Sequence, residues 1–358
     1  MAKNILIVTP KLTTWGGVSA FWNAILPRWS NYEDISIYKL EVGGHGKNIL
    51  GAILDQWKFN KCMKQNYDLV FLNPSLGSRS FVRDALFAKQ CIVKDVPFVV
   101  FFHAWSLDFE QKVDNKYSGF FLKTFGHAKK IFVLSEDFKR KIMEWGYNGE
   151  VIVEITTIDT ALLGGFSMDA KIEDYKQSPT IKILFLARLI KEKGIFETID
   201  AFQNISKKYD NLELTIAGDG KDFDVISALV VKDNNITITG YVEDKSKIEL
   251  LQNSHIYCLP SYTEGLPISV LEAMAFGMPI VTTSVGGLKQ FFKDKEMGYF
   301  VEVKNTKQLE EKLELLINDK KQMISIGTYN ANYIKESLLC TTVEKRLYNY
   351  MLEVINGE

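Results

Sequence analysis

The sequence predicts an α/β protein made of two doubly wound domains, each with a parallel sheet. Short apolar, β-branched runs alternate with longer amphipathic stretches along all 358 residues. Five such repeats fall in each half of the chain, and strands that alternate with helices at this spacing are typical of βαβ units. A polar stretch at residues 163–180 interrupts the alternation between the halves. The interruption favours two domains over a single eight-unit barrel, which is the alternative topology.

In the first half, five apolar runs are expected to form buried strands, because parallel strands covered on both faces are apolar throughout. These runs are residues 5–8, 35–38, 69–72, 98–102 and 131–134. The amphipathic stretches between them are expected to be helices at residues 18–29, 49–64, 79–93 and 137–145.

The second half repeats the pattern with strands expected at residues 181–186, 212–217, 236–238, 256–259 and 280–282. Helices are expected at residues 195–208, 223–231, 245–252 and 268–276. The polar stretch contains Gly164-Gly165 and Ser178-Pro179, which favour a linker. We therefore place an N-terminal domain at residues 1–162 and a C-terminal domain at 163–335. Residues 336–358 are expected to be a C-terminal helix that packs back across the domain junction.

Composition excludes several classes of protein. Hydrophobic residues make up 46% of the chain and charged residues 24%, which excludes a disordered, collagenous or coiled-coil protein. The net charge of −1 gives no overall basic field for nucleic acid. Residues 1–165 carry 20 Lys and Arg against 16 Asp and Glu, net +4, and the remainder carries 23 against 28, net −5.

The four cysteines are far apart, which argues against structural zinc or a disulfide framework. No run of 18 apolar residues is present, so we expect a cytoplasmic protein.

In open parallel sheets, ligands bind where the carboxyl ends of strands meet helix N-termini. After the first strand, Gly16-Gly17 open a helix, where a backbone without side chains lets a ligand come close. The spacing does not match the GxGxxG fingerprint, which argues against an NAD enzyme. After the fourth strand comes His103, placed to donate to a ligand. A tight turn and a structural histidine are the alternatives.

After the first strand of the second half, Arg188 and Lys193 flank a loop that leads into a helix. Two cations beside a helix N-terminus are typical of a phosphate or diphosphate site. Glu264 lies in a loop containing Gly and Pro after the strand at 256–259, and Glu272 lies one turn inside the next helix. The unpaired N–H groups near the start of that helix are expected to bind an anion between the two carboxylates. Solvated surface charges are the alternative at all four positions.

Together and in order, these passages resemble the retaining GT-B glycosyltransferases of glycosyltransferase family 4. The E-x7-E element is matched by Glu264 and Glu272 within EGLPISVLEAMAFGMPIV. Gly16-Gly17, His103, and the pair Arg188 and Lys193 are matched as well, as are residues 217–220, 240–241 and 283–287. The sequence departs from the family pattern in reading Glu-Gly-Leu-Pro rather than Glu-Gly-Phe-Gly, and in having Ala-Trp after the histidine. The match covers nearly the whole chain.

The resemblance implies two Rossmann-like domains that face a central cleft and a UDP- or GDP-sugar donor bound mainly by the second domain. It implies four catalytic residues: Arg188, Lys193, Glu264 and His103. It implies ten donor-binding residues: Gly16, Gly17, Gly218, Tyr241, Val242, Gly265, Leu266, Pro267, Ile268 and Glu272. Arg188 and Lys193 are expected to neutralise the departing diphosphate, so no metal or other cofactor is expected.

The acceptor is expected to be a saccharide or a lipid-linked saccharide bound by the first domain, in surface polysaccharide or glycoconjugate synthesis. Residues 120–130 interleave aromatic residues with lysines, as interfacial helices do. One interpretation is contact with an anionic membrane at the inner face of the cell membrane, and the other is a core-packing helix that ends in solvated lysines. A nucleotide-sugar epimerase, an inverting transferase and a non-catalytic sugar-nucleotide-binding protein stay open as alternative functions.

Overall fold

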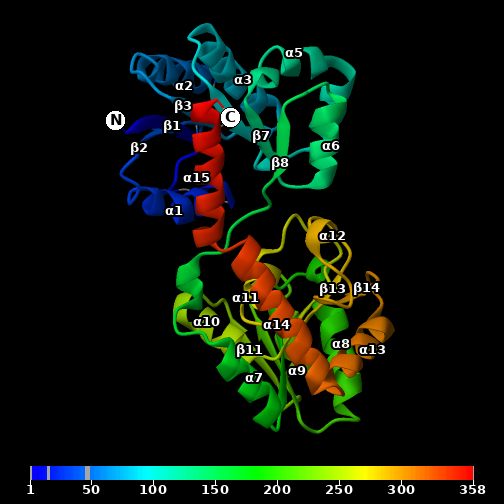
Figure 1. The fold of residues 1–358 in the computed structure, drawn as a ribbon. Coiled ribbons are helices and arrows are strands. Elements are labelled where there is room, and N and C mark those ends of the chain that lie inside the picture. The colour runs from blue at the N-terminus through cyan, green and yellow to red at the C-terminus, as the bar shows by residue number, and fades with distance from the viewer. Residues whose placement is uncertain (1, 14–16, 45–48, 358) are drawn as a thin grey trace. The chain divides into compact units, whose positions relative to one another are not determined.

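The computed structural model describes residues 2–13, 17–44 and 49–357, which form two compact units (Figure 1). Unit 1 consists of residues up to Thr157 together with Cys340–Glu358, and unit 2 consists of Ile158–Leu339. Each unit holds an open six-stranded sheet in which every strand pairs in parallel. The prediction of two doubly wound domains rather than a barrel is confirmed.

Unit 1 has the strand order β2-β1-β3-β5-β7-β8, with a small extra pair formed by β4 and β6. Its strands are β1 (Lys3–Thr9), β2 (Ile35–Glu41), β3 (Leu69–Leu72), β4 (Ser75–Leu76), β5 (Phe98–Phe101), β6 (Ala104–Trp105), β7 (Lys130–Val133) and β8 (Glu150–Val153). Its helices are α1 (Gly17–Trp29), α2 (Ile49–Cys62), α3 (Ser78–Val93), α4 (Leu107–Lys112), α5 (Ser118–Leu122), α6 (Glu136–Glu144) and α15 (Cys340–Asn356), and a π-helical turn spans Val113–Tyr117.

Unit 2 has the strand order β11-β10-β9-β12-β13-β14. Its strands are β9 (Ile181–Leu186), β10 (Leu212–Ala217), β11 (Ile236–Gly240), β12 (Ile256–Leu259), β13 (Ile280–Thr283) and β14 (Gly298–Val301). Its helices are α7 (Met168–Gln177), α8 (Ile195–Ser206), α9 (Phe223–Val230), α10 (Asp244–Asn253), α11 (Ile268–Ala275), α12 (Leu288–Phe291), α13 (Thr306–Ile317) and α14 (Lys320–Ser337).

The C-terminal helix α15 completes the core of unit 1. Its apolar stripe packs with α1 against one face of the sheet, and both helices contribute to the same buried cluster. The indole nitrogen of Trp29 donates to the backbone oxygen of Glu344 at 3.1 Å. Arg346 donates two hydrogen bonds to the buried carboxylate of Glu154, at 2.7 and 2.8 Å. The helix is therefore an integral part of unit 1, although the chain reaches it directly from unit 2.

The boundary in the structure differs slightly from the expected one at residues 162/163. Ile158 pairs with Leu339, and its N–H donates to the backbone oxygen of Leu338 at 2.8 Å. Residues 158–162 therefore group with unit 2. The polar stretch expected to be a linker contains α7, whose Lys171 and Tyr175 are buried against the loop that follows α10.

The interfacial-helix interpretation of residues 120–130 is wrong. The segment is divided among α5, a 3-10 turn at Phe125–His127 and the start of β7. Phe121 and Phe125 are fully buried, and Lys130 is buried beside Glu150 and Glu353. The aromatic spacing therefore reflects core packing, the alternative interpretation. Among the described residues, no helix is both long and apolar enough to cross a membrane.

We expect Arg346→Ala to lower the free energy of unfolding of unit 1 by about 2–3 kcal/mol, because it leaves the buried Glu154 carboxylate without its partner. All six tryptophans lie at positions within unit 1, so urea unfolding followed by tryptophan fluorescence reports on this unit. Adding Glu154→Gln should recover part of the loss. Arg140→Ala, which removes an exposed pair with Asp137, is the control and should change stability by less than about 0.5 kcal/mol. An equal effect of the two arginine substitutions would contradict the account.

Candidate functional site

In unit 2 the strand order reverses between β9 and β12. The chain proceeds from β9 to β10 and β11 on one side, and from β12 to β13 and β14 on the other. At such a reversal the loops after the two central strands diverge and leave a crevice at the carboxyl edge of the sheet. The loop after β9 carries Arg188 and Lys193, and the loop after β12 carries Glu264. The fold therefore brings three expected site residues to this edge.

The loops at this edge pack backbone against backbone at two glycines with positive φ. Gly194 has φ +74°, and a Cβ there would lie 2.2 Å from the oxygen of Pro260. Gly286 has φ +55°, and a Cβ there would lie 2.1 Å from the oxygen of Glu264. Any larger residue at either position would push the loop after β12 away from its neighbours. These contacts fix the backbone on which Glu264 stands.

Lys193 and Glu264 form a direct ion pair across the crevice edge. The Lys193 Nζ lies 2.6 Å from Oε1 of Glu264, and the two side chains are only 15% and 7% exposed. The hydroxyl of the fully buried Ser261 donates to the same carboxylate oxygen at 2.6 Å. The carboxylate is thus held in one orientation while its other oxygen stays available as an acceptor.

Arg188 is exposed, directly after β9. Its loop is held in place by the next loop of the sheet, since the N–H of Leu189 donates to the oxygen of Asp219 at 2.9 Å. The carboxylate of Asp222 accepts from the N–H of Lys191 at 2.7 Å. Gly218 lies at the end of β10 and donates to the oxygen of Gly240 at 2.8 Å. Arg188 and Gly218 therefore stand at the carboxyl ends of neighbouring strands.

Glu272 lies inside α11, where Nζ of Lys247 from α10 lies 2.7 Å from its Oε1. Both carboxylates of the E-x7-E element lie near the buried phenol of Tyr257. Burial raises the pKa of Tyr257 well above its usual range, and the negative charges of Glu272 and Glu264 add to the increase. The Tyr257 hydroxyl donates to the oxygen of Leu186 at 2.8 Å and lies 2.7 Å from the hydroxyl of Ser269. Tyr257 thus joins the end of β9 to the first turn of α11.

The remaining donor-binding predictions of unit 2 lie at the same edge of the sheet. Tyr241 is exposed and Val242 is half-buried, directly after β11. The residues before α11 form the end of the acidic loop, where the N–H of Gly287 donates to the oxygen of Gly265 at 2.6 Å. Along this segment Gly265 and Ile268 are exposed, Leu266 is half-buried and Pro267 is buried at the helix start.

In unit 1, His103 follows β5 and lies between aromatic rings. It stacks on Phe101, with ring centroids 3.7 Å apart, and meets the edge of Phe21. Burial lowers the pKa of His103 to about 3, so the ring is neutral near pH 7. Its Nε2 lies 3.0 Å from Oδ1 of Asn73, which also accepts from the indole of Trp22 at 3.1 Å.

The Asn73 contacts decide the tautomer of His103. The amide nitrogen of Asn73 donates to the oxygen of Val8 at 2.8 Å, so its Oδ1 is the atom that faces the imidazole. His103 must therefore donate from Nε2, which leaves Nδ1 as the ring's acceptor. In this arrangement the N–H of His103 is used within the fold, and its expected contact with a ligand stays a prediction.

Of the glycine pair after β1, one residue is among those that the structure describes. Gly16 lies outside the described residues. Gly17 is the first residue of α1 and is exposed, and no atom of the described residues would lie within 4 Å of a Cβ at this position. Packing among the described residues therefore does not require a glycine at position 17.

Three residues of these networks were missed at the sequence level. Asn73 directly follows the apolar strand β3, and a polar residue at the carboxyl end of a buried strand is itself an indication of a site. Ser261 precedes Glu264 by three residues in the loop and gave no separate signal. Lys247 stands in an ordinary amphipathic helix and looks like a solvated lysine until the fold places it beside Glu272.

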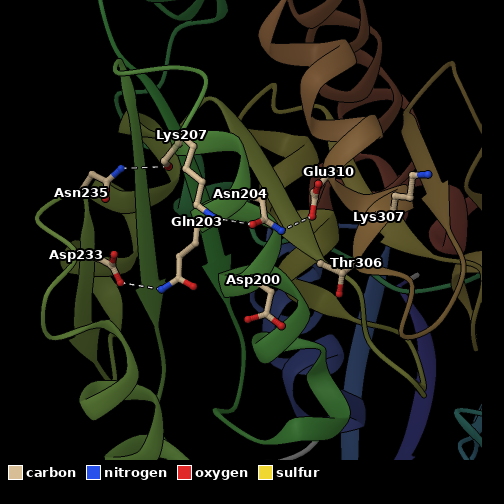
Figure 2. A pocket seen from close by; sticks show the side chains of 10 residues that line it. Asp200, Gln203, Asn204, Lys207, Asp233, Asn235, Thr306, Lys307 and Glu310 are labelled. Carbon is tan, nitrogen blue, oxygen red and sulfur yellow. Dashed lines mark hydrogen bonds between the residues drawn. The ribbon is translucent and has the colours of Figure 1, made fainter.

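A polar groove of about 800 Å³ lies on the surface of unit 2, and Figure 2 shows the side chains that line it. Its side chains come mainly from α8 and α13 and bind one another. Gln203 donates to Asp233 at 2.9 Å, and Asn204 donates to Glu310 at 2.7 Å. It contains none of the expected site residues. In the described ranges, no three His, Cys, Asp or Glu side chains lie close enough together to hold a metal ion.

Comparison with known proteins relates unit 2 to a family. Residues 169–333 match the family model described as "Glycosyl transferases group 1". The chain is 27% identical over 247 residues to the capsular polysaccharide biosynthesis glycosyltransferase CapM of Staphylococcus aureus, covering 64% of each chain. It is 34% identical over 146 residues to the N,N'-diacetylbacillosaminyl-diphospho-undecaprenol alpha-1,3-N-acetylgalactosaminyltransferase of Campylobacter jejuni, covering 40% of this chain and 38% of that one. The chain thus spans less than two thirds of the length of these relatives.

The whole chain is also similar to solved structures. HepE of Anabaena, crystallised in complex with UDP, matches 98% of this chain and 100% of its own, with a TM-score of 0.70 and 14% identity. At that identity the likeness shows the fold, which is GT-B. Residues 169–333 are thus similar to group 1 glycosyltransferases, and both relatives named above are glycosyltransferases.

We expect acid to destabilise unit 1 through His103. Its pKa is about 6.5 in the unfolded chain and about 3 in the folded unit, so the unfolded state binds more protons between these values. This contribution to stability is fully present above pH 6.5. It falls as the pH drops toward 3, by at most about 1.4 kcal/mol per pH unit.

Urea unfolding followed by tryptophan fluorescence at several pH values measures this slope. His103→Gln keeps a donor for Asn73 and should flatten it. His127→Gln, at an exposed histidine of the same unit, should leave it unchanged. A wild-type slope in the His103 variant would show that other groups cause the acid sensitivity.

Proposed function

We propose that this chain is a retaining glycosyltransferase of family 4 that transfers a sugar from a nucleotide-diphosphate sugar to a saccharide or lipid-linked acceptor. The observation that carries the proposal is the ion pair of Lys193 with Glu264 at the strand-order reversal of unit 2, with Arg188 on the same loop as Lys193. This edge lies in the part of the chain that matches the group 1 family.

The order of residues along the edge suits an extended donor. Tyr241 follows β11, Gly218 follows β10, Arg188 follows β9 and Glu264 follows β12, and these four strands are successive neighbours. Neighbouring strands lie about 4.8 Å apart, so the span from Tyr241 to Glu264 is about 14 Å. We assign the base to the Tyr241 and Val242 end, the diphosphate to the middle, and the sugar to the Glu264 end.

The two cations supply the electrostatics of the reaction. When the bond between the sugar C1 and the diphosphate oxygen breaks, negative charge develops on the leaving diphosphate, and fixed positive groups stabilise it. Lys193 is largely excluded from solvent, which strengthens its field. On donor binding, its ammonium is shared between the Glu264 carboxylate and the diphosphate. We therefore propose catalysis that needs no divalent cation.

The two carboxylates hold hydroxyl groups. Glu264, oriented by Ser261 and Lys193, accepts from hydroxyls of the donor sugar. Glu272 accepts from the ribose hydroxyls, in competition with Lys247. Neither carboxylate is proposed as a nucleophile. Instead, the acceptor oxygen bonds to C1 on the face that the diphosphate leaves, and the acceptor proton passes to an oxygen of the departing phosphate.

The comparisons support parts of this proposal. One relative is named for capsular polysaccharide biosynthesis, and another for a diphospho-undecaprenol substrate. One structural neighbour was crystallised with UDP. The roles of His103, Gly16 and Gly17 in unit 1 stay predictions. A nucleotide-sugar epimerase would instead form an epimer without acceptor, an inverting transferase would give the opposite anomer, and a binding protein would turn over no donor.

We expect Arg188→Ala and Lys193→Ala each to reduce kcat for sugar transfer by about 100-fold or more, because each removes a cation that stabilises the leaving diphosphate. The measurement is transfer or donor hydrolysis with UDP-, GDP- and ADP-sugars, in buffer containing EDTA. Wild-type activity should be unaffected by EDTA.

Lys191→Ala is the matched control, since Lys191 is an exposed cation on the same turn. It should retain near-wild-type kcat. Each variant should still unfold in one cooperative thermal transition, at a lower temperature in Lys193→Ala because the largely buried Glu264 carboxylate loses its partner. Wild-type rates in both the Arg188 and Lys193 variants, with the fold intact, would refute the proposed diphosphate site.

A further inference from the structure

Tyr262 lies in the loop after β12, two residues before Glu264, and contacts the chain on both sides of Lys193. Its backbone N–H donates to the oxygen of Glu192 at 2.8 Å, and its hydroxyl donates to Oε1 of Glu197 at 2.5 Å. Glu192 directly precedes Lys193 in the turn after β9, and Glu197 lies in the first turn of α8. One residue thus ties the loop that carries Glu264 to the segment that carries Lys193.

The ring of Tyr262 is also contacted by a cation from a third loop. The Nζ of Lys304, which follows β14, lies 4.9 Å from the centre of the ring, and an ammonium over an aromatic face is attracted to it. Burial raises the pKa of Tyr262, and the hydrogen bond to Glu197 adds to the increase. The phenol therefore stays protonated near neutral pH and remains the donor in its bond to Glu197.

The Glu197 carboxylate depends on Tyr262. Its Oε1 accepts from the phenol, whereas its buried Oε2 has no hydrogen-bond partner among the residues that the structure describes. A buried oxygen without a donor costs stability, and proteins keep such costs mainly where a site requires a particular arrangement. The contact of Glu197 with Tyr262 is therefore more than one of many surface hydrogen bonds.

The loop after β12 is fixed at both ends by close backbone contacts. Near its start, Pro260 packs against Gly194. Further along, Glu264 packs against Gly286. Tyr262 lies between these contacts, so its side chain holds the middle of the loop. Loss of the phenol hydroxyl would leave both ends in place and loosen the middle, where a small shift of the backbone moves the Glu264 carboxylate.

We propose that Tyr262 is a positioning residue that holds the Glu264 carboxylate where sugar transfer requires it. The inference rests on the proposed function, in which Glu264 accepts from hydroxyls of the donor sugar and Lys193 stabilises the diphosphate. The bond from the backbone of Tyr262 to Glu192 does not need the phenol. Loss of the hydroxyl therefore disturbs the sugar end of the site and leaves the diphosphate end in place.

The test is sugar transfer by Tyr262→Phe, with the nucleotide sugar that the wild type turns over. We expect kcat to fall about tenfold, because displacing a group by about 1 Å can cost about 100-fold in rate. The Kd of the matching nucleoside diphosphate, measured by calorimetry, should stay within about twofold of the wild-type value, as for sites that do not interact.

Variants of Glu197 separate positioning from loss of stability. Glu197→Ala removes the acceptor of the phenol and should lower kcat as Tyr262→Phe does. Glu197→Gln keeps an oxygen acceptor and should leave kcat closer to the wild-type value. If Tyr262→Phe is too unstable to assay, Tyr262→Phe/Glu197→Gln removes the hydroxyl without leaving a charged carboxylate unpaired, and its kcat should still be low.

Tyr329→Phe is the matched control. The Tyr329 hydroxyl lies 2.9 Å from Nζ of Lys293, and this ammonium also lies 5.6 Å from the centre of the Tyr329 ring. Tyr329 belongs to α14 and not to a loop of the site. The substitution removes a comparable contact and should change neither kcat nor the Kd of the nucleoside diphosphate.

A double-mutant cycle shows whether Tyr262 acts through Glu264. In a Glu264→Gln background, Tyr262→Phe should lower kcat by less than about twofold, whereas in a Glu272→Gln background it should lower kcat by the full factor of about ten. The inference is overturned, and the proposed function is not, by wild-type kcat in Tyr262→Phe or by equal factors in the two backgrounds. A loss of nucleoside diphosphate affinity as large as the loss of kcat would have the same meaning. A wild type that turns over no nucleotide sugar would overturn the proposed function, and this inference with it.

Discussion

The reversal of strand order between β9 and β12 is the constraint on which the candidate site depends. From this point the chain connects outward in opposite directions, so the loops after β9 and β12 diverge and leave a crevice at the carboxyl edge of the sheet. Their backbones are then locked by close contacts at Gly194 and Gly286. Lys193 and Glu264, which are 71 residues apart in sequence, meet at 2.6 Å as a consequence.

Local charge matters more than net charge in this chain. Residues 166–358 carry a net charge of −5, yet the proposed anionic donor is assigned to this part. A negatively charged half can still bind an anion because Lys193 is only 15% exposed, so water and salt screen its positive charge weakly. In unit 1 the excess of positive charge is similarly local. The acids of α2 and α3 are buried with Arg83, and the lysines of the same helices stay outside.

The sequence predicts the repeating elements well because each buried strand is a continuous apolar run and each helix has one apolar stripe. The last strands of both sheets, β8 and β14, were not expected. EVIV at 150–153 and GYFV at 298–301 are short edge strands, and they follow polar loops without a clear alternation of strand and helix. Residues 120–130 were ambiguous for a related reason, since core aromatics and interfacial aromatics have the same spacing. Contacts such as Lys247 with Glu272, or His103 with Asn73, depend on tertiary placement that no local pattern encodes.

The central claim is that the edge at β9 and β12 binds a diphosphate without a metal ion. Isothermal titration calorimetry of the wild type with nucleoside mono- and diphosphates in EDTA tests it most directly. For the nucleoside whose base the protein prefers, the nucleoside diphosphate should bind more tightly than the nucleoside monophosphate. That preference should be lost in the Arg188→Ala/Lys193→Ala variant and kept in Lys191→Ala. Equal affinity for the two nucleotides, or diphosphate binding only after a divalent cation is added, would contradict the account.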